Sequence, residues 1–395
     1  MATGTKLKLS KNNFNAFIDF YNRHNVIPVS QNIENLAEFI FRREYLYTKL
    51  GTPLPYFRER SVLEFGPGGG FNAIATSFYK PELYVFVDAS NASIEKLHSH
   101  NSSGAFNANK VEIINSNIYD YQDSREYDYV IIEGAICGQD DPGRMIKHVA
   151  KFVGNGGTLL TTATSATSVL SEVCRKLLRV KISECCHSFE SQVSMGSNIF
   201  KSHLESLGTI TRPIEDWVID VILNDWEKGK YVFTLIDLIE SIGDKFDFYN
   251  SSPSFVTDDR WYKKVTENSI SSNSNLDQQY ANVAAFFIDY RVSLDSVLKI
   301  KSDISEVEKL CALACSTHDG ILLANSYDQL DDFFKILLEL KKILPVEFYL
   351  TKLAIEDFIS SLPRFIENPK NIEFSDFSQW WGRGQQYVSF IKNSY

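Results

Sequence analysis

The stretch from Ser61 to Phe71 constrains the fold of this chain more than any other, because an apolar run passes directly into a glycine-rich turn. A second apolar run, Leu83–Val87, ends at Asp88. This order predicts a βαβ unit with a carboxylate at the end of its second strand, where it can accept hydrogen bonds from both hydroxyls of a ribose. Glycine tolerates positive φ and lets a ligand approach the backbone closely. The glycines of the turn are Gly66, Gly68 and Gly70.

The spacing of these glycines separates two cofactor classes. A dinucleotide fingerprint, G-x-G-x-x-G, would require glycine at position 71, which is Phe71. What remains is E-x-G-x-G-x-G from Glu64 to Gly70, and it resembles the first motif of the class I S-adenosylmethionine (SAM) methyltransferases at every defined position. The resemblance implies a Rossmann-like α/β sheet, SAM as cofactor, and cofactor contacts from Glu64, the three glycines and Asp88.

The resemblance continues through the following strands and covers about residues 58–165. A helix is expected over 92–100, a third strand over 111–114, a fourth ending at Glu133, a helix over 145–153, and a fifth strand over 158–163 after the glycine pair Gly156-Gly157. In the family, the residue after the third strand binds the adenine amino group. The resemblance therefore implies Asn117 or Asp120 for that contact, and Asn117 with Ile118 fits the spacing better.

In the family that the sequence resembles, a helix and a closing pair of strands follow the fifth strand. In this chain the corresponding helix is expected only later in the sequence. We expect residues 1–57 to form a helical leader, with helices over 14–21 and 37–50, and residues 58–165 to form the SAM-binding core. Residues 166–230 are expected to be a helical cap insertion. Residues 231–268 supply the closing helix, over 233–242, and a sixth strand, over 246–249. A Ser/Asn-rich linker then leads to a separate helical C-terminal region, 269–395, with a helix that stops at Pro363.

A general base is needed only if the methyl acceptor carries a proton on its nucleophilic atom. Glu133 is the best-placed carboxylate, because ligands of open α/β sheets bind at the carboxyl ends of the strands. His148 and then His187 are the next candidates. Glu133 could instead bind the cofactor or orient a substrate amine, and Arg43, Tyr45 and Tyr47 of the leader are candidates to touch the cofactor.

Three clusters combine tryptophan with charged and amide side chains, which suits sugars and their phosphates. They are similar to segments of bacterial methyltransferases encoded with surface-carbohydrate genes. The alternative is an amphipathic core edge. The candidate substrate-binding residues are Arg212, Trp217, Arg260 and Trp261, and the third cluster is 380–387.

Composition narrows the class of partner. The net charge of −10 and the pI near 5.3 argue against nucleic acid, and no apolar run approaches a membrane span. We expect a cytoplasmic enzyme. The six cysteines lack paired C-x-x-C spacing, so no metal site is expected, although Cys185-Cys186-His187 with His203 is a weak hint of one.

These observations predict a SAM-dependent methyltransferase whose acceptor is a small or medium polar metabolite, with a sugar or sugar-linked intermediate as the first candidate. Two alternatives stay open: an aminopropyl transferase, and a non-catalytic SAM-binding scaffold or regulatory subunit whose helical tail docks a partner. The amphipathic C-terminal helices are also candidates to form a homo-oligomer.

Overall fold

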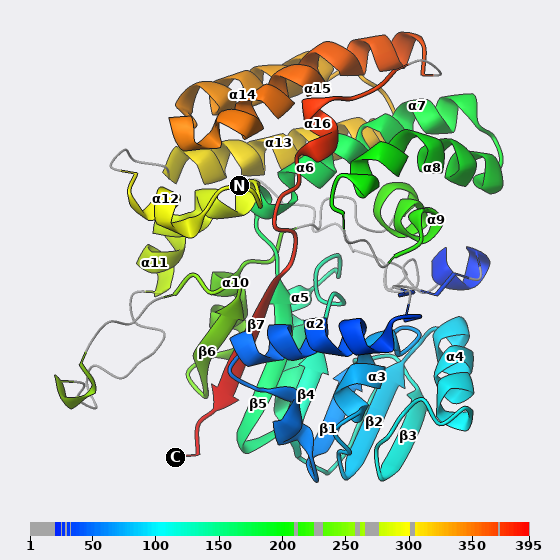
Figure 1. Ribbon diagram of the computed structural model, residues 1–395, viewed down its shortest axis with the longest axis vertical. Helices are drawn as coiled ribbons and strands as arrows, with labels where there is room; N and C mark the ends of the chain where they lie inside the picture. The colour runs from blue at the N-terminus through cyan, green and yellow to red at the C-terminus, as the bar shows by residue number, and fades with distance from the viewer. Residues whose placement is uncertain are drawn as a thin grey trace, which may run out of the picture.

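The computed structural model describes residues 20–24, 26–27, 30–31, 33–208, 212–224, 232–256, 261–264, 276–300, 305–369 and 372–394. Most of the helix expected over 14–21, Arg260 and the Ser/Asn-rich linker lie outside these residues. The described part of the chain forms a seven-stranded sheet with helices on both faces and a thick helical layer beyond one end (Figure 1). No helix in it has the length and apolar character that crossing a bilayer requires.

The sheet has the order β3-β2-β1-β4-β5-β7-β6. The first five strands of the chain are parallel, whereas β7 runs antiparallel to both of its neighbours. The strands are β1 Ser61–Phe65, β2 Leu83–Asp88, β3 Lys110–Asn115, β4 Tyr127–Ile132, β5 Val153–Ala163, β6 Phe246–Ser252 and β7 Gln386–Lys392.

The central strands form because both of their faces are covered by helices, so continuous apolar runs satisfy them. Val62 and Leu63 of β1 are both completely buried, yet they lie in different hydrophobic clusters, one on each face. The helices of the Val62 face are α2 Leu36–Lys49, α3 Phe71–Ser77 and α4 Asn91–Ser102. The Leu63 face is covered by α5 Pro142–Val149 and α10 Leu235–Ile242.

The cap insertion begins directly after β5 and lies beyond the carboxyl ends of the parallel strands (Figure 1). A π-helix, η3, continues α9 without a break, and π-helical turns are frequent at functional sites. The helical elements of the cap are α6 Ala166–Lys176, α7 Leu178–Cys185, α8 Phe189–Glu205, α9 Ile214–Trp217 and η3 Val218–Leu223.

The C-terminal helices pack on this cap rather than forming a separate unit. Leu170 of α6 lies in the same buried cluster as Cys311 and Phe333. The helices are α11 Leu276–Val283, α12 Leu294–Leu298, α13 Ser305–Ala324, α14 Leu330–Ile343, α15 Tyr349–Glu367 and α16 Asp376–Gln379. Short 3-10 helices are η1 Leu54–Phe57, η2 Ala150–Phe152, η4 Tyr262–Lys264, η6 Ala284–Ile288 and η7 Val346–Phe348.

The chain departs from the sequence-based expectation at three further places. The last residues are a strand, β7, inserted between β5 and β6, where Val388 and Phe390 are completely buried. Gly156 and Gly157, expected to precede the fifth strand, lie inside β5, where the register against β4 shifts. Helix α15 continues through Pro363 to Glu367, because its last turns bury Leu362 and Phe365 against the core.

Candidate active site

The glycine-rich turn has the backbone that its sequence predicts. Gly66, Gly68 and Gly70 have φ of +63°, +56° and +75°, a region that residues with a Cβ rarely adopt. Gly66 and Gly68 line a cavity of about 490 Å³, a size typical of small-molecule sites. Gly70 has a different role, since a Cβ there would lie 2.5 Å from Leu97, and the residue caps the start of α3.

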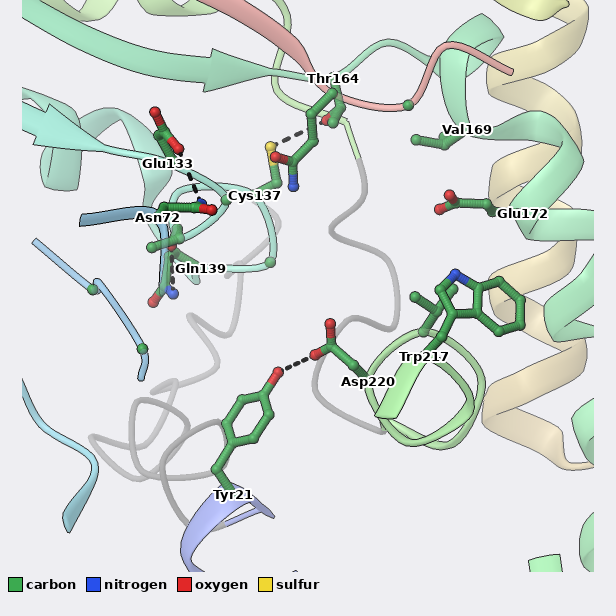
Figure 2. Close-up of a pocket in the computed structure, with 18 of the residues that line it drawn as sticks. Tyr21, Asn72, Glu133, Cys137, Gln139, Thr164, Val169, Glu172, Trp217 and Asp220 are labelled. Carbon is green, nitrogen blue, oxygen red and sulfur yellow. Dashed lines mark hydrogen bonds between the residues drawn. The ribbon is translucent and has the colours of Figure 1, made fainter. Parts of the chain in front are cut away.

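The cavity lies between the carboxyl ends of the parallel strands and the cap. Figure 2 shows Asn72, Glu133 and Gln139 on one side, with Val169, Glu172 and Trp217 on the other. The C-terminal segment 383–387, which leads into β7, also contributes to the wall. The site therefore draws on segments that are far apart in the sequence.

Asp88 lies in this cavity at the end of β2, as predicted. One carboxylate oxygen accepts a hydrogen bond from the Gly68 N–H at 3.1 Å, and the other from the Ser90 N–H at 2.8 Å. Burial raises the pKa of Asp88 to about 6, and these backbone hydrogen bonds oppose the rise. Each carboxylate oxygen of Asp88 keeps lone pairs that can accept further hydrogen bonds, as from the hydroxyls of a ribose. The glycine loop allows a ligand to approach the backbone closely. Both features fit the nucleoside of SAM.

Of the other residues predicted to contact the cofactor, only some line the cavity. Ile118 lines the cavity, but Asn117 does not: its side-chain oxygen accepts the Tyr119 N–H at 2.9 Å within a local turn. Glu64 does not line it either. Glu64 is buried below the loop and accepts a hydrogen bond from the Tyr84 hydroxyl. Burial, together with the charge of Glu133, raises the pKa of Glu64 to about 7.

Glu133 lines the cavity, but donors from the leader and from α3 occupy its carboxylate. The Arg43 Nη2 atom lies 2.9 Å from both oxygens, and the Tyr47 hydroxyl donates to one of them at 2.9 Å. Asn72 donates to the other at 3.4 Å. The side chains of Arg43 and Glu133 are only 9% and 8% exposed, so the ion pair is largely shielded from water. Two of the three leader candidates thus contact Glu133, whereas Tyr45 is 59% exposed.

The two histidine candidates do not line the cavity. His148, on α5, packs against Tyr119 and Phe152, and burial lowers its pKa. His187 is exposed in the cap. Within the described residues, no group of three His, Cys, Asp or Glu side chains is placed to hold a metal ion.

The far wall of the cavity contains two of the predicted substrate residues, Arg212 and Trp217. Arg212 pairs with Asp220 at 2.7 Å, and Tyr21 donates a hydrogen bond to the same carboxylate (Figure 2). Trp217 is 7% exposed because its ring packs edge-on against Phe200 and Trp381.

The remaining aromatic clusters do not form part of the site as predicted. Trp261 is 59% exposed and does not line the cavity, and Arg260 lies outside the described residues. Trp380 and Trp381 are buried, and both indole N–H groups donate to backbone carbonyls. The 380–387 cluster is therefore mainly a core edge, although Arg383, Gln385 and Tyr387 reach the cavity.

Sequence reasoning missed several cavity residues. Glu172 and Lys176, which lie one helical turn apart on α6, are two of them, whereas Gln385 and Tyr387 belong to the 380–387 cluster that the sequence had offered. Val169 and Val173 lie on one face of a helix, and from this register Glu172 and Lys176 could have been predicted to lie near the same wall of the cavity. No local signal connects residues 385–387 with a loop at residue 66.

A family model described as a methyltransferase domain matches residues 33–195. Among solved structures, magnesium protoporphyrin IX methyltransferase from Synechocystis PCC 6803 with bound S-adenosylhomocysteine (SAH) is 12% identical, with a TM-score of 0.37 over 61% of this chain and 92% of that chain. N-methyltransferase NodS from Bradyrhizobium japonicum WM9, also with SAH, is 12% identical, with a TM-score of 0.27 over 34% and 74%.

No curated protein matches the chain. The family match nevertheless includes helix α2 of the leader, the glycine loop, Asp88 and all five parallel strands, and it ends within the cap. Residues 33–195 thus form a methyltransferase domain, and SAM is the cofactor that its glycine loop and Asp88 fit.

Proposed function

We propose that this enzyme transfers the methyl group of SAM to a small or medium polar acceptor, with a sugar or sugar-linked intermediate as the first class to test. The observation that supports this proposal is the continuity of the cavity. One hollow is lined by Gly66, Gly68 and Asp88 at the cofactor end and by the Arg212–Asp220 pair at the cap end. Charged and amide side chains in the lining of this cavity suit a polar rather than a lipid-like acceptor.

SAM supplies a methyl group that its sulfonium already activates. The chain must therefore bind the acceptor, align its nucleophilic atom with the methyl group and exclude water, and such alignment is worth several kcal/mol. The cap and segment 383–387 cover the carboxyl ends of the strands, which supports a role in excluding water.

Glu133 has a structural role, and this role conflicts with that of a general base. A proton on its carboxylate would weaken the hydrogen bonds from Arg43 and Tyr47, which hold α2 against the end of β4. We therefore propose that Glu133 positions the leader at the cavity and does not accept the acceptor proton.

The proposal is tested with purified protein, methyl-labelled SAM and a panel of monosaccharides and nucleotide sugars, followed by detection of labelled product and SAH. Calorimetry with SAH and with NAD measures cofactor choice separately. Gly68→Val is the negative control, because its side chain would enter the cofactor end of the cavity. Binding of NAD in place of SAH would refute the proposal, and SAH binding without turnover of any acceptor would favour the scaffold alternative.

A further inference from the structure

Four acidic side chains line the described part of the cavity, and three of them have hydrogen-bond donors within the protein. Asp88 accepts from two backbone N–H groups, Glu133 from Arg43, Tyr47 and Asn72, and Asp220 from Tyr21 and Arg212. The fourth, Glu172, accepts no hydrogen bond and forms no ion pair with any described residue. Its carboxylate points into the hollow from α6, on the side opposite Gln139 (Figure 2).

The backbone that carries Glu172 is held at several points. Ser165 and Ser168 form a reciprocal capping box at the start of α6. The C-terminal segment adds two hydrogen bonds, from the Gly382 N–H to the Ser171 hydroxyl at 2.8 Å and from the Gly384 N–H to the Ser168 carbonyl at 3.1 Å. A side chain on so constrained a helix has a defined direction, as a group that must meet a substrate requires.

No charged side chain among the described residues forms an ion pair with the Glu172 carboxylate. Burial raises the pKa of the Glu172 carboxyl, the positive charges of Lys176, Arg175 and Arg212 oppose that rise, and Asp220 adds to it. The Glu172 side chain is only partly exposed, and a shielded carboxylate with no donor among the described residues is costly, so its presence in a folded protein needs a structural or functional explanation. The missing donor is thus expected to come from the molecule that occupies the cap end of the cavity.

We propose that Glu172 is the general base of the reaction: it accepts a hydrogen bond from the nucleophilic O–H or N–H of the acceptor and then takes that proton. This inference rests on the proposed function. As the oxygen or nitrogen forms its bond to the methyl carbon, the carbon–sulfur bond breaks, its electron pair stays on sulfur, and the proton passes to the Glu172 carboxylate. A carboxylate acceptor is excluded, because it has no proton to lose and would place a second negative charge beside Glu172.

The first test needs no acceptor. Protein labelled with 13C at the glutamate carboxyl carbon is titrated by NMR in the presence of SAH, and Glu172→Gln identifies the resonance. We expect Glu172 to titrate above the ordinary glutamate value of about 4.3. Titration at or below that value would show that a cation pairs with Glu172 in solution, and it would overturn the proposal.

The second test uses three matched sugars, glucose, glucosamine and glucuronate, as free sugars and as nucleotide sugars. Methylation is expected on hydroxyl or amine groups, and the position of the label distinguishes these two acceptors. Glu172→Gln should lower kcat by about 10²–10⁴ and remove the acidic limb of the pH–rate profile, while the Kd for SAH changes less than about twofold. Glu172→Asp should retain part of the activity.

Glu190→Gln is the matched control, because it removes an exposed glutamate from another helix of the cap. Methylation of a carboxylate, or normal turnover by Glu172→Gln, would overturn the proposal. Failure of the wild-type protein to bind SAH would instead refute the proposed function. If no sugar is methylated, the NMR titration decides whether Glu172 is unpaired.

Discussion

Replacement of Arg43 by methionine should be among the most destabilising single changes near the site, because it leaves the Glu133 carboxylate buried without its cation. The two side chains are 9% and 8% exposed, and the guanidinium reaches both carboxylate oxygens at 2.9 Å. Removal of one partner of a buried ion pair typically costs about 3–5 kcal/mol. Tyr47 and Asn72 would still donate to Glu133. We therefore expect a loss near the lower end, about 3 kcal/mol.

The double variant Arg43→Met/Glu133→Gln separates the charge from the packing. The glutamine at position 133 carries no charge and can still accept from Tyr47, so the buried charge disappears along with its partner. We expect the double variant to be more stable than Arg43→Met alone, with a coupling energy of about 2 kcal/mol between the two sites.

Urea unfolding, followed by circular dichroism and tryptophan fluorescence, measures these differences in the free energy of unfolding. Arg42→Met is the matched control on the same helix, since Arg42 pairs with Glu38 on the surface, where the side chains are 37% and 51% exposed. Such a pair contributes about 0.5 kcal/mol or less. The reasoning is refuted if Arg43→Met costs no more than Arg42→Met, or if the double variant loses the sum of its single changes.

Three further predictions concern the cofactor end and the C-terminal segment. The pKa of Asp88 is raised to about 6, and the ionised form is the better acceptor for ribose hydroxyls, so SAH affinity in calorimetry should fall as the pH drops below about 6. Asp88→Ala should weaken binding by about 1.5–3 kcal/mol at pH 7.5 and remove this pH dependence; an unchanged profile would contradict the assignment. The pKa of Glu64 is raised to about 7, so its stabilising contribution is present at low pH and lost as the pH rises through about 7. The urea midpoint of Glu64→Gln should therefore decline less between pH 5 and pH 8 than that of the wild type, and an equal decline would show that other groups cause it. Gly382→Ala should destabilise by more than about 2 kcal/mol, because the new Cβ would lie 2.1 Å from the Ser168 carbonyl oxygen. Gly384→Ala, with φ of +57° and no atom within 4 Å, should cost only about 1–2 kcal/mol, and a thermal-unfolding comparison that reverses this order would contradict the structure.

The features that the sequence predicted correctly are those that depend on neighbours in the chain. The glycine turn requires residues that accept positive φ, and three such residues at alternate positions after an apolar strand indicate it directly. Asp88 follows its strand without interruption, so its place at the rim of the sheet follows from the βαβ unit. The closing helix expected over 233–242 is likewise present as α10, and it ends at Ile242, directly before Gly243.

The sequence could not show which side chains satisfy one another across the fold. Glu133 was a reasonable base from its position at the end of β4, but Arg43 and Tyr47, about ninety residues earlier, occupy its oxygens. Glu172 showed no motif, and its importance rests on the absence of a donor among the described residues, which depends on every wall of the cavity. Strand β7 pairs with β5 and β6 although more than a hundred residues separate it from both.

The sequence alone therefore determined the nucleotide-binding half of the protein, because hydrophobic periodicity, glycine conformation and strand-end carboxylates act within a few residues. Only the tertiary structure decided how the sheet is closed, which carboxylate in the cavity is neutralised and which has no donor among the described residues. Hydrogen bonding and burial are properties of groups that meet in space. Arg43 reaches Glu133, and Glu133, Glu172 and Gln385 come to line one cavity, only after the whole chain has folded.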